Sequence, residues 1–493
     1  MAQVALDALL KGLVSEPVGA AAITGLSLDS RYVRPGGLFV ALRGATTDGY
    51  GYIDMAVANG AAAVVYDSDA GVAPAVSAIP CIAMDDLRRK AGVIAERFYG
   101  HPSRQLEMAG ITGTNGKTSC CHFLAQMYHR VYGGCGVVGT LGNGLWGDLQ
   151  PATHTTPDAV RLHGLLREMA DQGATRVVME VSSHGLDQGR VAGVEFDTAV
   201  FTNLSRDHLD YHGDMAAYGR AKGRLFTMPG VRRAIINWDD DFGRELAAGL
   251  PAGLSVVPYG LGRVPHSDAG WLTGRIAQVD RNGLTLEVDS AWGQGRVETR
   301  LLGRFNAYNL LAVLATALAG GMAFGPALTA LEELTAVPGR MERFGREDQP
   351  MVVVDYAHTP DALDQALLTL REVCEARLWV VFGCGGDRDR GKRSLMGAVA
   401  QRHADVVVLT DDNPRHEDAV VIIDDIRSGM AEGAPMAVIS DRAQAIAHAV
   451  DGAAANDVVL IAGKGHEDYQ QVGDERRPFS DRHTVERLLE AAA

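Results

Sequence analysis

The sequence has 493 residues, of which 47% are hydrophobic and 22% are charged, as in ordinary soluble globular proteins. Its net charge of −15 argues against broad binding to nucleic acid or to anionic membranes, which requires basic surfaces. The six cysteines form no Cys-x-x-Cys pair, which argues against a zinc site or a disulfide framework and favours a reducing compartment. We therefore expect a cytoplasmic protein without membrane insertion.

The length predicts about three domains, which we place at residues 1–102, 103–336 and 337–493. The first block alternates short apolar runs with turns, and the runs 38–42 and 62–66 predict strands. Two polar turns of this block stand out, although taken alone they are plain loops. One turn contains Leu28 and Ser30, and the other contains Ala45, Thr46 and Thr47.

In the second block the apolar runs 108–112, 177–181 and 198–202 predict buried strands that alternate with helices. This alternation indicates a parallel sheet with ligands at the carboxyl ends of its strands. Residues 257–300 are richer in glycine and alternating polar residues, which favours antiparallel strands, and a helix is expected over 306–318.

The third block contains four nearly continuous apolar runs separated by helical segments. Such strands are buried on both faces, so the pattern predicts a doubly wound, Rossmann-like sheet. The fold class is therefore α/β throughout. The runs are 351–355, 378–382, 406–410 and 458–462.

A glycine-rich turn, Gly110–Ser119, joins the first strand of the second block to a helix. Glycines let backbone N–H groups surround phosphate oxygens, and a helix N-terminus favours negative charge. The spacing departs from the strict GxxxxGK[ST] pattern at Ile111, and a glycine turn without nucleotide is the alternative. We expect Lys117 to contact the β- and γ-phosphates, Thr118 to reach Mg²⁺, and ATP contacts from Gly113, Thr114, Asn115, Gly116, Lys117, Thr118 and Ser119.

The run Gly-Thr-Asn-Gly-Lys-Thr resembles the ATP loop of the Mur ligases and of their folylpolyglutamate synthetase relatives. Further motifs of the Mur ligases occur in order in all three blocks. The resemblance implies a uridine-nucleotide domain, a central ATPase domain and an amino-acid-binding Rossmann-like domain. It also implies that Asn306, Arg340, Asp355 and His358 contact the nucleotide.

Metal and carbamate candidates lie in the second block. Glu180 ends a strand, where a carboxylate suits Mg²⁺, whereas His208 taken alone would be a loop histidine and Lys222 a surface lysine. The resemblance implies that Glu180 and His208 hold a second magnesium ion and that Lys222 is carbamylated. Carbamylation requires a neutral amine and hence a lowered pKa.

The resemblance also assigns the substrate contacts. The UDP-N-acetylmuramoyl-dipeptide would meet Leu28, Ser30, Ala45–Thr47, Thr155, Thr156, Ser182, Gln188 and Arg190, the last of which could otherwise be a surface arginine. The run Asp412-Asn413-Pro414-Arg415 resembles the motif of members that add meso-diaminopimelate, whose far carboxylate a guanidinium can grip in bidentate fashion. A turn arginine without a ligand is the alternative. Arg388, Gly463 and Glu467 complete this implied pocket, and Glu467 would receive the far amino group.

The implied activity is ATP-dependent amide formation. ATP phosphorylates the D-glutamate side-chain carboxylate of UDP-N-acetylmuramoyl-L-Ala-D-Glu, and an amine of meso-diaminopimelate then attacks the acyl phosphate. The resemblance implies that the enzyme is a monomer and acts in peptidoglycan precursor synthesis. Three alternatives remain: the same ligase adding L-lysine, a folylpolyglutamate synthetase-like ligase, and a nucleotide-binding regulator or mechanical ATPase without ligase chemistry.

Overall fold

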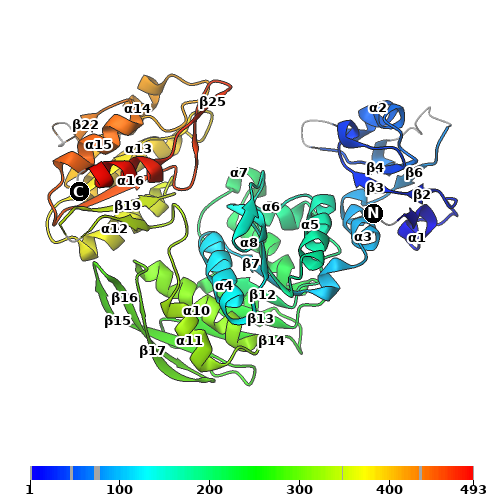
Figure 1. The fold of residues 1–493 in the computed structure, drawn as a ribbon, viewed down its shortest axis with the longest axis horizontal. Helices are drawn as coiled ribbons and strands as arrows, with labels where there is room; N and C mark the ends of the chain where they lie inside the picture. Colours follow the sequence, from blue (N-terminus) through cyan, green and yellow to red (C-terminus); the bar gives the residue numbers. More distant parts are fainter. Residues whose placement is uncertain are drawn as a thin grey trace. The chain divides into compact units, whose positions relative to one another are not determined.

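The computed structural model describes residues 3–44, 48–70, 78–346, 348–431, 433 and 436–491. The chain divides into two compact units. The first contains residues 1–260, 264–272 and 312–323, and the second contains 261–263, 273–311 and 324–493. The colours of Figure 1 follow the chain from blue to red. Among the described residues, none of the helices is long and apolar enough to cross a membrane.

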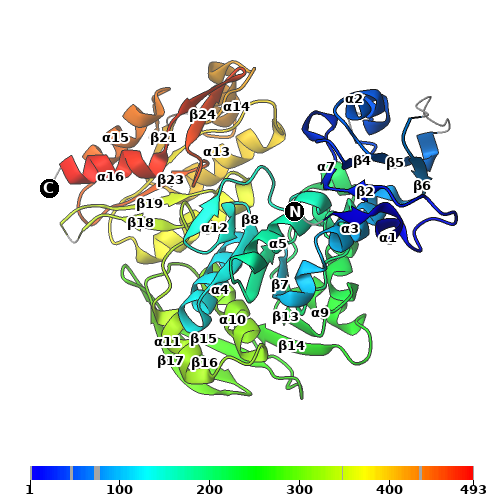
Figure 2. The ribbon, with the colours of Figure 1, turned by 45° about the vertical axis from the view of Figure 1, so that its right-hand side comes forward.

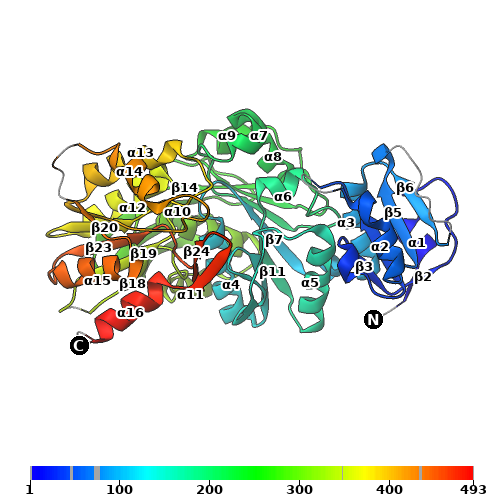
Figure 3. The ribbon, with the colours of Figure 1, turned by 90° about the horizontal axis from the view of Figure 1, so that it is seen from above.

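The first unit begins with a small parallel sheet in the order β3-β4-β5-β6, which forms the blue part of Figure 3. Its strands β4 and β5 confirm the two predicted runs within a residue. Alternate residues of the strands pack on α1 and α3 on one face and on α2 on the other. The bounds are β3 Gly25–Ser27, β4 Gly37–Ala41, β5 Ala63–Asp67, β6 Cys81–Met84, α1 Leu6–Leu10, α2 Ile53–Ala58 and α3 Leu87–Phe98, with a short ladder of β1 Val4–Ala5 and β2 Ala22–Ile23.

The first unit also contains the strands β10-β9-β8-β11-β7-β12-β13-β14, in this order, of a larger sheet that continues with β15, β16 and β17. Strands β8, β11, β7, β12, β13 and β14 are parallel, so their carboxyl ends meet at one edge. On one face, these strands pack against α5 and against apolar residues of 186–196 and 225–226. The strands are β7 Glu107–Thr112, β8 Cys135–Gly139, β9 Gly142–Leu145, β10 Asp148–Gln150, β11 Arg176–Glu180, β12 Thr198–Phe201, β13 Arg233–Asn237 and β14 Ser255–Gly260.

The helices of the larger sheet begin at polar caps or glycines. Asp158 caps α5 by accepting from Arg161 N, and Gly116 precedes α4 in a left-handed conformation that suits glycine. The helices are α4 Lys117–Tyr132, α5 Ala159–Asp171, α6 Ser183–Asp187, α7 Leu209–His212, α8 Met215–Gly223 and α9 Asp241–Ala248.

The expectation of antiparallel strands over 257–300 is wrong at its start. Strand β14 pairs parallel with β13, because its apolar run Val257–Gly260 is buried like the other central strands. Strands β16 Gly283–Ser290 and β17 Gly293–Thr299 confirm the rest, since they form an antiparallel ladder. The remaining elements of this region are β15 Leu272–Asp280, α10 Arg304–Ala319, which matches the expected helix, and α11 Phe324–Glu332.

The second unit contains a sheet in the order β18-β19-β23-β20-β21-β22, coloured yellow to red in Figure 2. All pairs are parallel except β18 with β19, and the four predicted apolar runs are confirmed as β19, β20, β21 and β23. Helices α12–α14 pack on one face and α15 and α16 on the other. The bounds are β18 Glu342–Phe344, β19 Met351–Asp355, β20 Leu378–Phe382, β21 Val406–Leu409, β22 Met436–Val438, β23 Val458–Ala462, α12 Pro360–Val373, α13 Gly391–His403, α14 Ala419–Arg427, α15 Arg442–Gly452, α16 Asp481–Ala491 and the hairpin β24 Tyr469–Val472 with β25 Glu475–Pro478.

Candidate active site

The glycine-rich turn leaves β7 at its carboxyl end and leads into α4. Gly113 has φ of +150°, and a Cβ there would lie 1.8 Å from Thr202 Oγ1, so only glycine fits. The Lys117 ammonium folds back over the turn and donates to Gly113 O at 2.9 Å and to Thr114 O at 2.8 Å. Lys117 therefore lies against the backbone that the sequence assigns to the phosphates.

Asn203, just after β12, braces this turn. It accepts from Thr114 N through its carbonyl at 2.8 Å and from Asn115 N through Oδ1 at 2.9 Å, and its Nδ2 donates to Asn115 O at 3.1 Å. The sequence did not single out Asn203 as a functional residue. Its position at the carboxyl end of a neighbouring parallel strand was the available signal.

Glu180 is fully buried at the carboxyl end of β11. Its Oε2 accepts from Thr118 Oγ1 at 2.8 Å and from Thr140 Oγ1 at 3.2 Å, and its Oε1 accepts from Thr140 N at 2.7 Å. Gly139 leaves room for this carboxylate, since a Cβ there would lie 2.4 Å from Oε1. The carboxylate is thus held by donors beside the phosphate loop.

The Thr118 hydroxyl and the Glu180 carboxylate are oxygen ligands of the kind that Mg²⁺ prefers. Within the described part of the chain, three or more His, Cys, Asp or Glu side chains nowhere gather as a metal cage. Mg²⁺ usually takes only one or two carboxylates and completes its shell with phosphates and waters. The residues present therefore fit a magnesium ion that arrives with a nucleotide.

Lys222 is not the surface lysine that its local sequence suggests, because it is only 1% exposed. Its Nζ donates to Gly113 O at 2.7 Å and lies 4.3 Å from the centre of the Tyr218 ring. Burial, and then the charge of Lys117, lower the pKa of Lys222 well below its usual value. A neutral amine is the form that can be carbamylated.

His208 lies in a cluster of rings with His184, whose centre is 4.8 Å away, and Tyr218. Burial lowers the pKa of His208, with further lowering by Lys117 and Lys222 against the opposing effect of Asp207. Burial and the neighbouring His208 and His212 lower the pKa of His184 to about 4. The cluster therefore holds neutral imidazoles, the form that can bind a metal ion.

The candidate dipeptide contacts of the second block meet beyond β11. Thr156 Oγ1 accepts from Ser182 N at 3.0 Å and donates to Glu180 O at 2.9 Å. Arg190 donates to Gln188 Oε1 at 2.7 Å and to Thr156 O at 2.8 Å, so it is a braced, half-buried group. Thr155 Oγ1 lies 3.0 Å from Thr140 Oγ1, within hydrogen-bonding distance.

The contacts assigned to the first block lie apart from this group in the chain. Ser30 is buried, with its hydroxyl 3.3 Å from Met55 Sδ and its carbonyl accepting from Asn59 Nδ2 at 2.8 Å. Leu28 is half-buried just before it. Ala45, Thr46 and Thr47 lie outside the described residues.

Three of the four candidate nucleotide contacts of the second unit gather at the carboxyl end of β19. The Arg340 guanidinium lies 4.4 Å from the centre of the Tyr356 ring, and His358 Nδ1 is 2.9 Å from Tyr356 O. Asp355 accepts from Met341 N at 2.7 Å. Asn306 lies in α10 instead and donates to Leu302 O at 2.8 Å.

The candidate amino-acid pocket is assembled by the turn after β21, the loop after β20 and the loop after β23. Asn413 Nδ2 donates to Glu467 Oε2 at 2.8 Å. Gly463 leaves space for the Asp412 side chain, because a Cβ at position 463 would lie 2.6 Å from Asp412 Oδ2. Arg415 Nη1 donates to Gly386 O at 2.8 Å. Pro414 also lies against Gly386, because a Cβ at position 386 would lie 1.9 Å from the carbonyl oxygen of Pro414.

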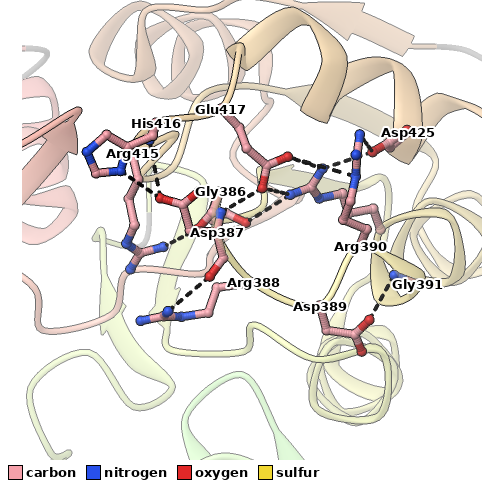
Figure 4. Close-up of polar contacts among 12 residues, drawn as sticks. Gly386, Asp387, Arg388, Asp389, Arg390, Gly391, Arg415, His416, Glu417 and Asp425 are labelled. Atoms are coloured by element: carbon pink, nitrogen blue, oxygen red, sulfur yellow. Dashed lines mark hydrogen bonds and ion pairs between the residues drawn. The ribbon is translucent and has the colours of Figure 1, made fainter. Parts of the chain in front are cut away.

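Arg388 is exposed on the loop after β20, next to the segment that Arg415 contacts, as Figure 4 shows. Its Nη1 donates to Asp387 O at 3.0 Å. Lys464 is the residue of this pocket that the sequence did not assign a role. It is fully buried and donates to Asn413 Oδ1 at 2.8 Å and to Tyr469 O at 2.7 Å.

Comparisons with known proteins identify the family of the chain. Three family models match the chain: "Mur ligase family, catalytic domain" over residues 22–99, "Mur ligase middle domain" over 111–317 and "Mur ligase, glutamate ligase domain" over 339–465. A UDP-N-acetylmuramoyl-L-alanyl-D-glutamate--2,6-diaminopimelate ligase of Alkalilimnicola ehrlichii is 51% identical over 96% of this chain and 95% of its own length. The chain belongs to the Mur ligase family.

Other relatives of this Mur ligase carry the same name. The protein of Coxiella burnetii is 47% identical over 98% of both chains. A solved structure of a UDP-N-acetylmuramoyl-L-alanyl-D-glutamate--2,6-diaminopimelate ligase superposes with a TM-score of 0.72 at 38% identity, covering 100% of this chain and 99% of that one. A MurF of Acinetobacter baumannii shares the fold, with a TM-score of 0.65 at 19% identity, over 100% of this chain and 99% of its own.

Proposed function

We propose that this Mur ligase joins meso-2,6-diaminopimelate to the D-glutamate side-chain carboxylate of UDP-N-acetylmuramoyl-L-alanyl-D-glutamate, at the expense of ATP, in peptidoglycan precursor synthesis. One observation of the structure carries the choice of amino acid. The turn that bears Arg415 also bears Asn413, whose amide contacts the Glu467 carboxylate at 2.8 Å. An anionic and a cationic group of the ligand thus have partners of opposite charge on neighbouring segments. The names of the relatives support the same choice.

The proposed chemistry needs no side-chain nucleophile. The D-glutamate carboxylate attacks the γ-phosphorus of ATP, ADP leaves, and the resulting acyl phosphate is attacked by a neutral amine of diaminopimelate. The tetrahedral intermediate expels inorganic phosphate, and the amine loses one proton. Lys117 balances charge on the transferred phosphoryl group, and Arg190 orients the anionic substrate.

One magnesium ion would be held by Thr118 beside the ATP phosphates and a second by Glu180 and His208, with carbamylated Lys222 helping to place a magnesium ion. Bound Mg²⁺ neutralises phosphate charge that would otherwise repel the incoming carboxylate. The observations that support these assignments are the Thr118–Glu180 hydrogen bond of 2.8 Å and the lowered pKa of Lys222.

Arg415 and Arg388 would bind the far carboxylate of diaminopimelate, which L-lysine lacks, while Glu467 receives the far ammonium group. A lysine-adding enzyme has no use for a guanidinium at this position. We also propose that the enzyme acts as a cytoplasmic monomer. Its six cysteines are free thiols, as suits a reducing compartment.

The test is release of phosphate from ATP by the full-length enzyme with each substrate omitted in turn. Release should require both the UDP-muramoyl-dipeptide and diaminopimelate, and the product should gain the mass of one diaminopimelate residue. Release independent of the muramoyl substrate would contradict the proposal and favour an ATPase without ligase chemistry.

A further inference from the structure

Arg393, on α13, is a fully buried arginine outside the set of groups discussed so far. Its Nη2 donates to Glu417 Oε1 at 2.8 Å, and its Nη1 donates to Glu417 Oε2 at 3.0 Å and to Asp425 Oδ2 at 2.8 Å. A buried guanidinium is costly unless carboxylates pair with it, and this one has two. The Glu417 carboxylate is thereby held in a single orientation.

Glu417 connects the two segments that carry the candidate clamp arginines. It follows Arg415 by two residues, and its Oε1 also accepts from the backbone N–H of Asp387 at 2.6 Å. Asp387 directly precedes Arg388. Figure 4 shows Glu417 above the loop that carries Asp387 and Arg388, with Arg415 to its left and Asp425 to its right. The Glu417 carboxylate therefore links the turn that carries Arg415 to the loop that carries Arg388.

Backbone strain indicates that these ties are needed. Asp387 and Arg415 have φ of +52° and +51°, a left-handed conformation that is uncommon for residues other than glycine. Such residues persist where surrounding contacts over-determine the backbone. Around them, Gly386 N donates to Asn413 O at 2.9 Å and His416 Nδ1 lies 2.9 Å from Asp387 Oδ2.

We propose that Glu417, held by Arg393, is a positioning residue for the amino-acid substrate, which sets the placement of Arg388 relative to Arg415. The proposal rests on the proposed function and adds to it the residues that shape the clamp. Neither Glu417 nor Arg393 needs to touch the substrate. Loss of the Glu417 carboxylate releases Asp387 N and lets the Arg388 loop leave its strained conformation, so the two guanidinium groups no longer converge on one carboxylate.

The test compares Glu417→Ala, Glu417→Gln and the control Asp424→Ala in the full-length enzyme. The control removes one carboxylate from α14, where Asp424 forms an ion pair with the exposed Arg427 at 3.3 Å. Glutamine at position 417 can still accept from Asp387 N, so it should restore much of the effect. Arg393→Lys, which keeps the charge but not the two-pronged grip, provides an independent variant.

Steady-state KM is measured for diaminopimelate, ATP and the UDP-muramoyl-dipeptide. We expect Glu417→Ala to raise KM for diaminopimelate by about tenfold or more, the order expected for loss of a hydrogen bond to a charged group. KM for ATP and for the dipeptide should stay within about twofold, and Arg393→Lys should act in the same direction. A merely structural role would lower kcat through loss of active enzyme and leave all three KM values unchanged.

The outcomes separate the two proposals. If wild-type enzyme ligates diaminopimelate but Glu417→Ala and Arg393→Lys leave its KM unchanged, the positioning role is wrong and the proposed function stands. A parallel rise of all three KM values would also overturn the positioning role. If the wild type does not ligate diaminopimelate, both proposals fail.

Discussion

The Lys464 ammonium lies 2.8 Å from Asn413 Oδ1, and this contact fixes the orientation of the Asn413 amide. Lysine can only donate, and Gln471 N donates to the same oxygen at 2.8 Å. The amide nitrogen must then face Glu467, where it donates to Oε2 at 2.8 Å. Lys464 Nζ also lies 3.4 Å from the same carboxylate oxygen, so Asn413 and Lys464 together hold Glu467.

Replacement of Lys464 by methionine should therefore weaken binding of the amino acid. The change keeps the length of the side chain but removes the donor, so the Asn413 amide can turn and Glu467 loses its fixed position. We expect KM for diaminopimelate to rise by about tenfold, as for one charge-assisted hydrogen bond. The exposed Lys11→Met is the control, and an unchanged KM in Lys464→Met would contradict this role.

Lys222→Arg should abolish most of the activity, because a guanidinium remains charged and cannot be carbamylated. The pKa of Lys222 is lowered, first by burial and then by the charge of Lys117, which raises the fraction of neutral amine. Enzyme equilibrated with ¹³C-bicarbonate should show a carbamate carbon resonance that Lys222→Arg lacks. An identical spectrum for the two proteins would show that Lys222 is not the modified residue.

Arg415→Ala should reduce discrimination against L-lysine. The wild-type guanidinium donates to Gly386 O, and in the proposed function it binds a ligand carboxylate that lysine lacks. We expect kcat/KM for diaminopimelate to fall by about 10²-fold or more, since a charged hydrogen-bonding partner is lost, while kcat/KM for lysine changes little. The exposed Arg427→Ala should behave as wild type. Equal losses for both amino acids would argue against selection by Arg415.

His416 should make the pocket loops more stable at lower pH. Its hydrogen bond to Asp387, and then the charge of Asp474, raise the pKa of His416 above its usual value. A raised folded-state pKa stabilises the fold fully below the unfolded pKa of about 6.5, and this contribution is lost as pH rises through the folded-state pKa.

The corresponding measurement is the difference in Tm between wild type and His416→Gln across this range. The difference should be largest near pH 5.5 and vanish by about pH 9, on the basis of the ordinary histidine pKa. Because the group is exposed, high salt should shrink the difference. A difference that grows with pH would contradict the assignment.

The strands could be predicted because parallel strands buried on both faces are nearly continuous apolar runs. Met351–Asp355 and Val458–Ala462 are examples, and both lie in the sheet as expected. At β14 the expectation fails because the range 257–300 joins the apolar, buried run Val257–Gly260 to the glycine-rich polar residues that follow it.

The burial of single charged residues could not be predicted. Lys222 lies on a short helix, and its buried ammonium contacts the Gly113 turn, 109 positions away in the sequence. Arg393 and Glu417 are 24 residues apart and belong to separate segments. No local pattern marks such pairs, so their roles emerge only when the fold brings the segments together.

The most direct measurement is a competition in one vessel between equal concentrations of meso-diaminopimelate and L-lysine, with ATP and UDP-N-acetylmuramoyl-L-alanyl-D-glutamate. The masses of the products and the released phosphate are followed together. The account predicts a diaminopimelate product in stoichiometric amount with phosphate and almost no lysine product. A predominant lysine product, or phosphate release without any new amide, would contradict it.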